Sequence, residues 1–228
     1  MTDNSRVDLS EEELRELIPQ LQQLTEQYKR AERVQKALFD ISELSSSVSD
    51  LPNLYRSIHN IVGDFLNADN FFVAFYEREE KVIDFAYFVD EFDEQTVKQI
   101  PAEQLMDGIT GWILRTGEHL VFGKENATEV LGSKGITVMG SLPSDFIGVP
   151  LKRGAQVIGA MVVQTYDESL RYSGDDLEVL LFVSQHIVTT VDRVKSREVT
   201  ERTIRERTKQ LRKINDDLQD EILERQKV

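Results

Sequence analysis

Cysteine is absent from the 228-residue chain. Its absence excludes disulfides, thiolate metal sites, cysteine nucleophiles and thioether-linked cofactors. No apolar run approaches the roughly 20 residues that a helix needs to span a bilayer, so we expect no membrane contact. The first ten residues lack the basic and then apolar pattern of a signal peptide, which makes the cytoplasm the expected location.

Basic residues are scarce. The chain has 27 Lys and Arg against 41 Asp and Glu, a formal net charge of −14. Nucleic acids and anionic membranes attract positively charged surfaces, so this balance weighs against both as partners.

Glycine is missing from both ends of the chain. All 12 glycines lie between Gly63 and Gly174, and four of the five prolines fall in nearly the same window. Because these residues mark turns and interrupt helices, the pattern predicts a turn-rich body between two helical arms. The exception, Pro19, is expected to kink or restart the first arm. We divide the chain into an N-terminal arm (1–34), a body (35–192) and a C-terminal arm (193–228).

Both arms show the alternating three- and four-residue apolar spacing of coiled coils. In the C-terminal arm the seam contains Val194, Arg197, Glu201, Ile204, Leu211, Asn215, Leu218 and Ile222. Arg197 and Glu201 interrupt the seam with charge, and Asn215 is a polar residue of the kind that fixes register in two-stranded coils. The pattern predicts a parallel homodimer through the terminal helices. The alternative is a single amphipathic helix that packs on its own domain, which fits as far as Val194.

The body shows the patterns of a mixed α+β domain. A helix with Asp50 as N-cap is expected at 51–66, and a second helix at 109–115, closed by Gly117. Alternating apolar runs predict two hairpins and two short strands, which makes the pairing antiparallel. The expected strands are 71–76 with 82–89, 146–151 with 156–165, 119–122 and 137–139.

Three stretches of the body resemble the GAF domain family. They are Gly108-Ile-Thr-Gly-Trp-Ile-Leu-Arg-Thr-Gly-Glu118, the run Phe146-Ile-Gly-Val-Pro-Leu151 with Val157-Ile-Gly-Ala-Met-Val-Val-Gln164, and Tyr172-Ser-Gly-Asp-Asp-Leu-Glu-Val-Leu180. The resemblance implies an α+β fold with a central antiparallel sheet of about six strands, helices on one face and loops over a pocket on the other. It also implies a sensory module that binds small ligands, dimerises and passes a change along a helix.

The C-terminal arm resembles the linkers that join bacterial sensor domains to PAS, histidine-kinase or diguanylate-cyclase modules. This resemblance implies an output domain in the same full-length chain. No catalytic constellation is recognisable in the chain itself, so we expect it not to be an enzyme.

The branches of the family that depend on cysteine are excluded here. These are covalent bilin binding and methionine-sulfoxide reduction, so no covalent cofactor is expected. The Asn-Lys-Phe-Asp-Glu set of the cyclic-nucleotide branch cannot be placed. His59, His119 and His186 are 60 or more residues apart, which is not metal-ligand spacing, so we expect structural roles for them and no metal site.

A noncovalent small-molecule pocket remains. By resemblance, its residues would be Phe72, Tyr87, Trp112, Phe122, Thr137, Met139, Ser141, Ser144 and Phe146. Aromatic walls with few polar groups are typical of small-ligand sites, although an aromatic residue on a strand is more often part of the core. Two hypotheses follow: a ligand sensor, or a purely structural dimerisation domain whose pocket is filled by its own side chains.

Overall fold

The computed structural model describes residues 11–48, 50–92 and 98–225, without some of the side chains in the terminal helices. Its centre is one six-stranded antiparallel sheet in the order β3-β2-β1-β6-β5-β4. The strands are β1 (Asn70–Glu77), β2 (Val82–Val89), β3 (Gln99–Pro101), β4 (Leu120–Gly123), β5 (Asp145–Arg153) and β6 (Gln156–Thr165). The sequence-based expectation of a six-stranded α+β fold is therefore confirmed.

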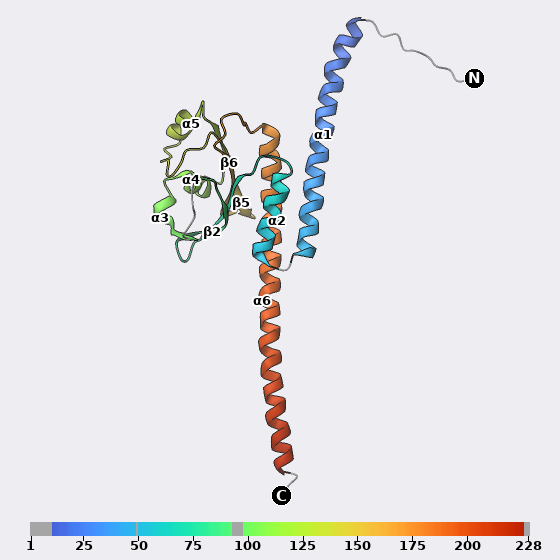
Figure 1. Cartoon of the computed structure of the whole chain (residues 1–228), viewed down its shortest axis with the longest axis vertical. Helices are drawn as coiled ribbons and strands as arrows, with labels where there is room; N and C mark the ends of the chain where they lie inside the picture. The colour runs from blue at the N-terminus through green and yellow to red at the C-terminus, as the bar shows by residue number, and fades with distance from the viewer. Residues whose placement is uncertain (1–10, 49, 93–97, 226–228) are drawn as a thin grey trace, which may run out of the picture.

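Helices cover both faces of the sheet (Figure 1). On one face, α2 (Leu51–Gly63) and α6 (Gly174–Arg225) pack on the strands, and α1 (Glu11–Ser47) packs against these two helices. Short helices and loops cover the other face: α3 (Ala102–Leu105), α4 (Ile109–Thr116) and α5 (Ala127–Ser133). Each face has its own hydrophobic core, because successive side chains of a strand point to opposite sides of the sheet. We call these the long-helix face and the short-helix face.

Local sequence signals place the helix ends as expected. Asp50 caps α2 by accepting a hydrogen bond from the backbone N–H of Asn53 at 2.9 Å, which satisfies one of the free donors of the first turn. Gly117 ends α4 in the left-handed conformation at φ 68°, which glycine adopts without steric cost.

A β-bulge in β2 changes which side chains face which side. Val73 pairs with Tyr87, but the next residue, Ala74, pairs with Phe85. Ala86 is thus the extra residue of the bulge, and the alternation of sides reverses across it. Phe85 lies on the short-helix face, whereas Tyr87 lies on the long-helix face.

Two expectations about local structure are corrected. Residues 137–139 form no strand; the sixth strand is β3, a short edge strand that pairs with the start of β2. Pro19 does not restart the first arm, because α1 is one continuous helix that contains it. α1 also runs through position 34, and α6 through position 192, without a break in either helix.

The helix α6 belongs to the domain and also extends beyond it. Its N-terminal part buries Leu180, Val183 and Ile187 completely against the sheet. Each such side chain contributes about 1.5–3 kcal/mol to stability through burial. Val194 is the last buried residue among those whose exposure is described, and beyond it the helix continues as a single rod to Arg225 (Figure 1).

Beyond Val194, the seam side chains that the structure describes lie exposed on the helix surface. Arg197 and Glu201 form an ion pair at 3.0 Å, one helical turn apart. Ile204, Leu211 and Asn215 are exposed. Leu218 and Ile222 lie on the same helix, but their side chains are outside the described part of the structure. Within the described ranges, no helix has the length and apolarity required to cross a bilayer.

Candidate ligand cavity

A cavity of about 390 Å³ lies on the short-helix face, between the sheet, α4 and the loop that follows α5. This volume falls within the range of small-ligand sites. It is lined by Phe72, Phe85, Phe88, Phe92, Ile100, Leu105, Gly108, Ile109, Thr110, Met139, Gly140, Ser141, Pro143, Phe146 and Gln164.

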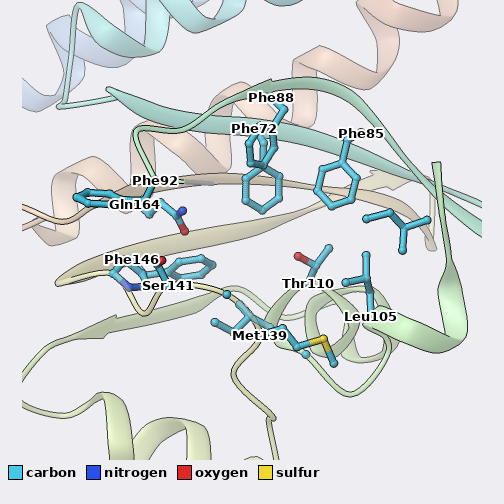
Figure 2. Close-up of a pocket in the computed structure, with 15 residues that line it drawn as sticks. Phe72, Phe85, Phe88, Phe92, Leu105, Thr110, Met139, Ser141, Phe146 and Gln164 are labelled. Carbon is cyan, nitrogen blue, oxygen red and sulfur yellow. The ribbon is translucent and has the colours of Figure 1, made fainter. Parts of the chain in front are cut away.

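One wall of the cavity is aromatic. Phe72 of β1 has its ring centroid 5.5 Å from that of Phe85 and 5.8 Å from that of Phe88, both in β2. Phe85 and Phe88 meet edge to face at 5.9 Å. Because the three rings pack on one another, they form one continuous wall instead of surrounding the cavity. Figure 2 shows this wall across from Leu105, Thr110 and Met139.

The opposite wall depends on the close approach of α4 to the preceding turn. A side chain at Gly111 would place its Cβ 2.3 Å from the Cα of Met106, so only glycine allows this packing. The approach holds the first turn of α4, with Gly108 as its N-cap, against the cavity. Ile109 and Thr110 are thereby placed in the wall.

The polar end of the cavity is built on Gln164, the residue before the last in β6. Its Nε2 lies 2.6 Å from Oδ2 of Asp90 and 3.0 Å from the hydroxyl of Tyr166. Asp90 also accepts a hydrogen bond from the backbone N–H of Phe92 at 2.9 Å, and the ring of Phe92 meets that of Tyr166 at 4.5 Å. The network therefore fixes both Gln164 and the aromatic residue at the rim.

None of the described residues that line the cavity carries a charge. The nearest buried acid in sequence is Asp145, which precedes the lining residue Phe146 but does not line the cavity itself. Burial raises the pKa of Asp145, against the opposing effects of backbone N–H donors from Tyr172 and Phe146 and of Arg171 at 3.8 Å. The described lining of the cavity is thus apolar, with a few neutral hydrogen-bonding groups.

Four of the nine residues expected from the sequence line this cavity: Phe72, Met139, Ser141 and Phe146. Two others lie in the core behind it. Phe122 stacks on Phe146 at 4.9 Å, and Trp112 is buried in α4 with the Lys134 ammonium 4.5 Å from its ring centre.

Two of the expected polar contacts are made within the protein instead. The hydroxyl of Ser144 donates to the carbonyl oxygen of Tyr166 at 3.0 Å. The backbone N–H of Thr137 donates to the carbonyl oxygen of Asp107 at 2.8 Å, and this residue does not line the cavity.

The assignment of Tyr87 to this pocket is wrong, because the bulge at Ala86 turns its ring to the long-helix face. There the Tyr87 hydroxyl lies 2.9 Å from Nδ1 of His59, whose Nε2 lies 2.6 Å from the carbonyl oxygen of Ala68. This geometry fits the tautomer in which Nε2–H donates to Ala68 and Nδ1 accepts from Tyr87. His59 therefore links α2 to the sheet. Among the described residues, no group of three His, Asp or Glu is placed to hold a metal.

Several lining residues were not identified from the sequence. Phe85 alternates with Ile83 along the chain, and this spacing of two residues indicates that both lie on the same face of β2. Gln164 is a polar residue on the same face of β6 as the apolar residues Val162 and Ala160. A polar residue in such a row indicates a candidate site. Leu105 ends the short helix α3, Thr110 lies in the first turn of α4 and Pro143 lies in a loop, and no local pattern indicates their tertiary position.

Comparison with known proteins agrees with the fold. A family model for the GAF domain matches residues 48–192. Similar solved structures include the GAF domain of a phosphoenolpyruvate-protein phosphotransferase from Coxiella burnetii, at 11% identity and a TM-score of 0.59 over 74% of this chain and 98% of that chain. The chain matches no protein of curated function.

Two further solved structures show what this fold holds elsewhere. Free methionine-R-sulfoxide reductase from Neisseria meningitidis, solved with its substrate, has 14% identity and a TM-score of 0.55 over 72% of this chain and 90% of that chain. A phycoerythrobilin-bound GAF domain from a cyanobacterial phytochrome has 10% identity and a TM-score of 0.53 over 72% and 97%. Identities this low indicate a shared fold alone, whereas the family model covers more than half of the chain. The chain belongs to the GAF domain family.

Proposed function

We propose that this chain is a cytoplasmic sensory module that binds a small molecule noncovalently in the cavity, forms a homodimer and relays occupancy through α6. GAF domains are sensory and regulatory modules of signalling proteins. The receiver would be an output domain in the same full-length chain, of the diguanylate-cyclase, PAS or histidine-kinase class that the C-terminal arm resembles. No catalytic step is assigned to the 228 residues themselves.

The observation that carries this proposal is that two strands separate the cavity from α6. On β5, Phe146 lines the cavity while the next residue, Ile147, is buried in the core beneath the long helices. On β6, Gln164 lines the cavity while Val163 belongs to the same core as Leu180 and Val183 of α6. A ligand that displaces Phe146 or Gln164 therefore acts on the strands that support the helix.

The form of α6 supports the relay and the dimer. The same uninterrupted helix packs on the sheet and then extends past Val194 to Arg225. Ile204 and Leu211, two seam residues of this extension, are 58% and 66% exposed, an arrangement that a second copy of the helix would cover. The charged pair Arg197–Glu201 weakens the seam locally, which suits a helix that changes register at little cost.

A thermal-shift screen of nucleotides, amino acids and tetrapyrroles on the full chain tests the ligand. A compound present at 100 times its Kd adds about 2.7 kcal/mol to the free energy of unfolding, which is easily detected. Thr110→Phe places a ring inside the cavity and should abolish the shift. Arg115→Phe introduces the same side chain at an exposed position of the same helix and should leave the shift intact.

The alternative function is a structural dimerisation domain with a self-filled pocket. The free volume of about 390 Å³ favours the sensor. If no compound raises the unfolding temperature of the wild-type chain, or if Thr110→Phe responds to the same compounds as the wild type, the structural function is preferred.

A further inference from the structure

The side-chain amide of Gln164 has only one orientation compatible with its neighbours. Both oxygens of the Asp90 carboxylate are acceptors, and Oδ2 lies 2.6 Å from Gln164 Nε2. The Tyr166 hydroxyl, 3.0 Å from the same nitrogen, lies 3.3 Å from Asp90 and can donate to it. The NH₂ group of Gln164 must therefore face Asp90, since the opposite orientation would set the Gln164 oxygen against a carboxylate.

This orientation leaves the Gln164 oxygen for the cavity. Gln164 is 9% exposed and lines the cavity, yet both of its side-chain hydrogen bonds within the described residues come from Nε2. Figure 2 shows its side chain at the end of the aromatic wall, above Ser141 and Phe146. A ligand that covers this oxygen removes it from water, so a ligand that supplies an N–H or O–H group in place of water gains affinity over one that supplies none.

The remaining lining favours an uncharged and planar molecule. The wall of Phe72, Phe85 and Phe88 faces Leu105 and Met139, so the space between them suits a flat apolar body. Among the described lining residues no side chain could neutralise a ligand charge. Removing a charge from water without a partner is strongly unfavourable, and the net charge of −14 further disfavours anions.

We propose that the cavity selects an uncharged aromatic molecule that donates an N–H or O–H hydrogen bond to Gln164 Oε1. The inference rests on the proposed ligand-binding function and adds the chemical class of the ligand. Asp90 does not touch the ligand; it acts as a positioning residue that decides whether Gln164 offers an acceptor or a donor.

The test compares indole with benzofuran, which has nearly the same shape but carries an acceptor oxygen in place of the N–H. Isothermal titration calorimetry on the full chain should give a Kd for indole about tenfold lower than for benzofuran, because benzofuran leaves the Gln164 oxygen without a donor. Indole-3-acetate and tryptamine, which carry a negative and a positive charge, should both bind more weakly than indole.

Two variants test the positioning. In Asp90→Asn, the side-chain oxygen can keep the hydrogen bond from Phe92 while the new NH₂ group faces Gln164. Gln164 must then turn its oxygen to the introduced amide and its NH₂ group to the cavity, so the preference for indole over benzofuran should be lost or reversed. Tyr166→Phe keeps the carboxylate and the ring, so the preference for indole should persist. Circular dichroism and the unfolding temperature establish that each variant is folded.

The possible outcomes separate this inference from the function on which it rests. Equal affinities for indole and benzofuran, tighter binding of a charged probe, or an unchanged preference in folded Asp90→Asn would each overturn the inference. If neither neutral probe binds while other compounds from the screen do, the ligand class is wrong and the sensory function stands. If nothing binds in the cavity at all, both proposals fail.

Discussion

Replacing Ile204 by Lys should break a coiled-coil dimer, whereas the same replacement at Val199 should not. Both residues are β-branched, exposed and on α6 beyond the domain, at 58% and 65% exposure. They differ in position: Ile204 lies on the predicted seam, and Val199 lies two residues after the seam position Arg197, on the opposite side of the helix. Because helix propensity changes similarly in both variants, a difference in dimer Kd between them reports the contribution of the seam position alone.

The size of the effect follows from the exposed area. Full burial of an Ile side chain contributes about 1.5–3 kcal/mol, and 58% of Ile204 remains to be covered. Each copy would then contribute about 0.9–1.7 kcal/mol, and the two copies in a dimer about 1.7–3.5 kcal/mol. Loss of this burial corresponds to a rise in the dimer Kd of roughly 20- to 400-fold, before any repulsion between the two lysines is added.

Sedimentation equilibrium of the full chain over a range of concentrations measures this Kd directly. The expected result is a dimer for the wild type and for Val199→Lys, and a shift toward monomer for Ile204→Lys. Equal dimer Kd values for the two variants would refute the assignment of the dimer contact to the predicted seam. A monomeric wild-type chain would refute the dimer itself.

Three further outcomes are expected. Gly111→Ala should lower the free energy of unfolding by about 3 kcal/mol or more, because its Cβ meets backbone at 2.3 Å, whereas Gly132→Ala, with open space around it, should not; urea denaturation separates the two. Arg197→Leu combined with Glu201→Leu should lower the dimer Kd in sedimentation, because it removes charge from the seam; a raised Kd would contradict this reasoning. Burial raises the pKa of Asp145, so the folded state binds its proton more tightly than the unfolded chain and stability falls as the pH rises above the ordinary value of 3.8. Asp145→Asn should remove that part of the pH dependence, as measured by urea unfolding at a series of pH values; an unchanged slope would contradict this assignment.

The sheet and its helices were predictable because their signals are local. The hairpin of β5 and β6, the cap at Asp50 and the end of α4 at Gly117 depend on residues close to one another in sequence. The short strand β3 was missed because three residues carry no periodicity. A strand was expected at residues 137–139, but Val138 and Met139 are exposed and the backbone N–H of Thr137 donates to Asp107, outside the sheet.

The cavity was less predictable than the fold for two physical reasons. A single bulge residue, Ala86, reverses the faces of β2, and the residue pattern alone does not reveal it, so Tyr87 was placed on the wrong side. The role of Gln164 depends on Asp90, 74 positions earlier in the chain, and such a pairing appears only once β6 and the end of β2 are brought together by the fold.

Hydrogen–deuterium exchange tests most directly whether the cavity and α6 are coupled. The full chain would be compared with and without a saturating concentration of the tightest binder from the screen, with Thr110→Phe as the control that cannot bind. We expect ligand to change exchange at Phe146 and Gln164 and also in α6 between residues 195 and 215, and to change neither in the control. A change confined to the cavity residues, with α6 unaffected, would contradict the proposed relay.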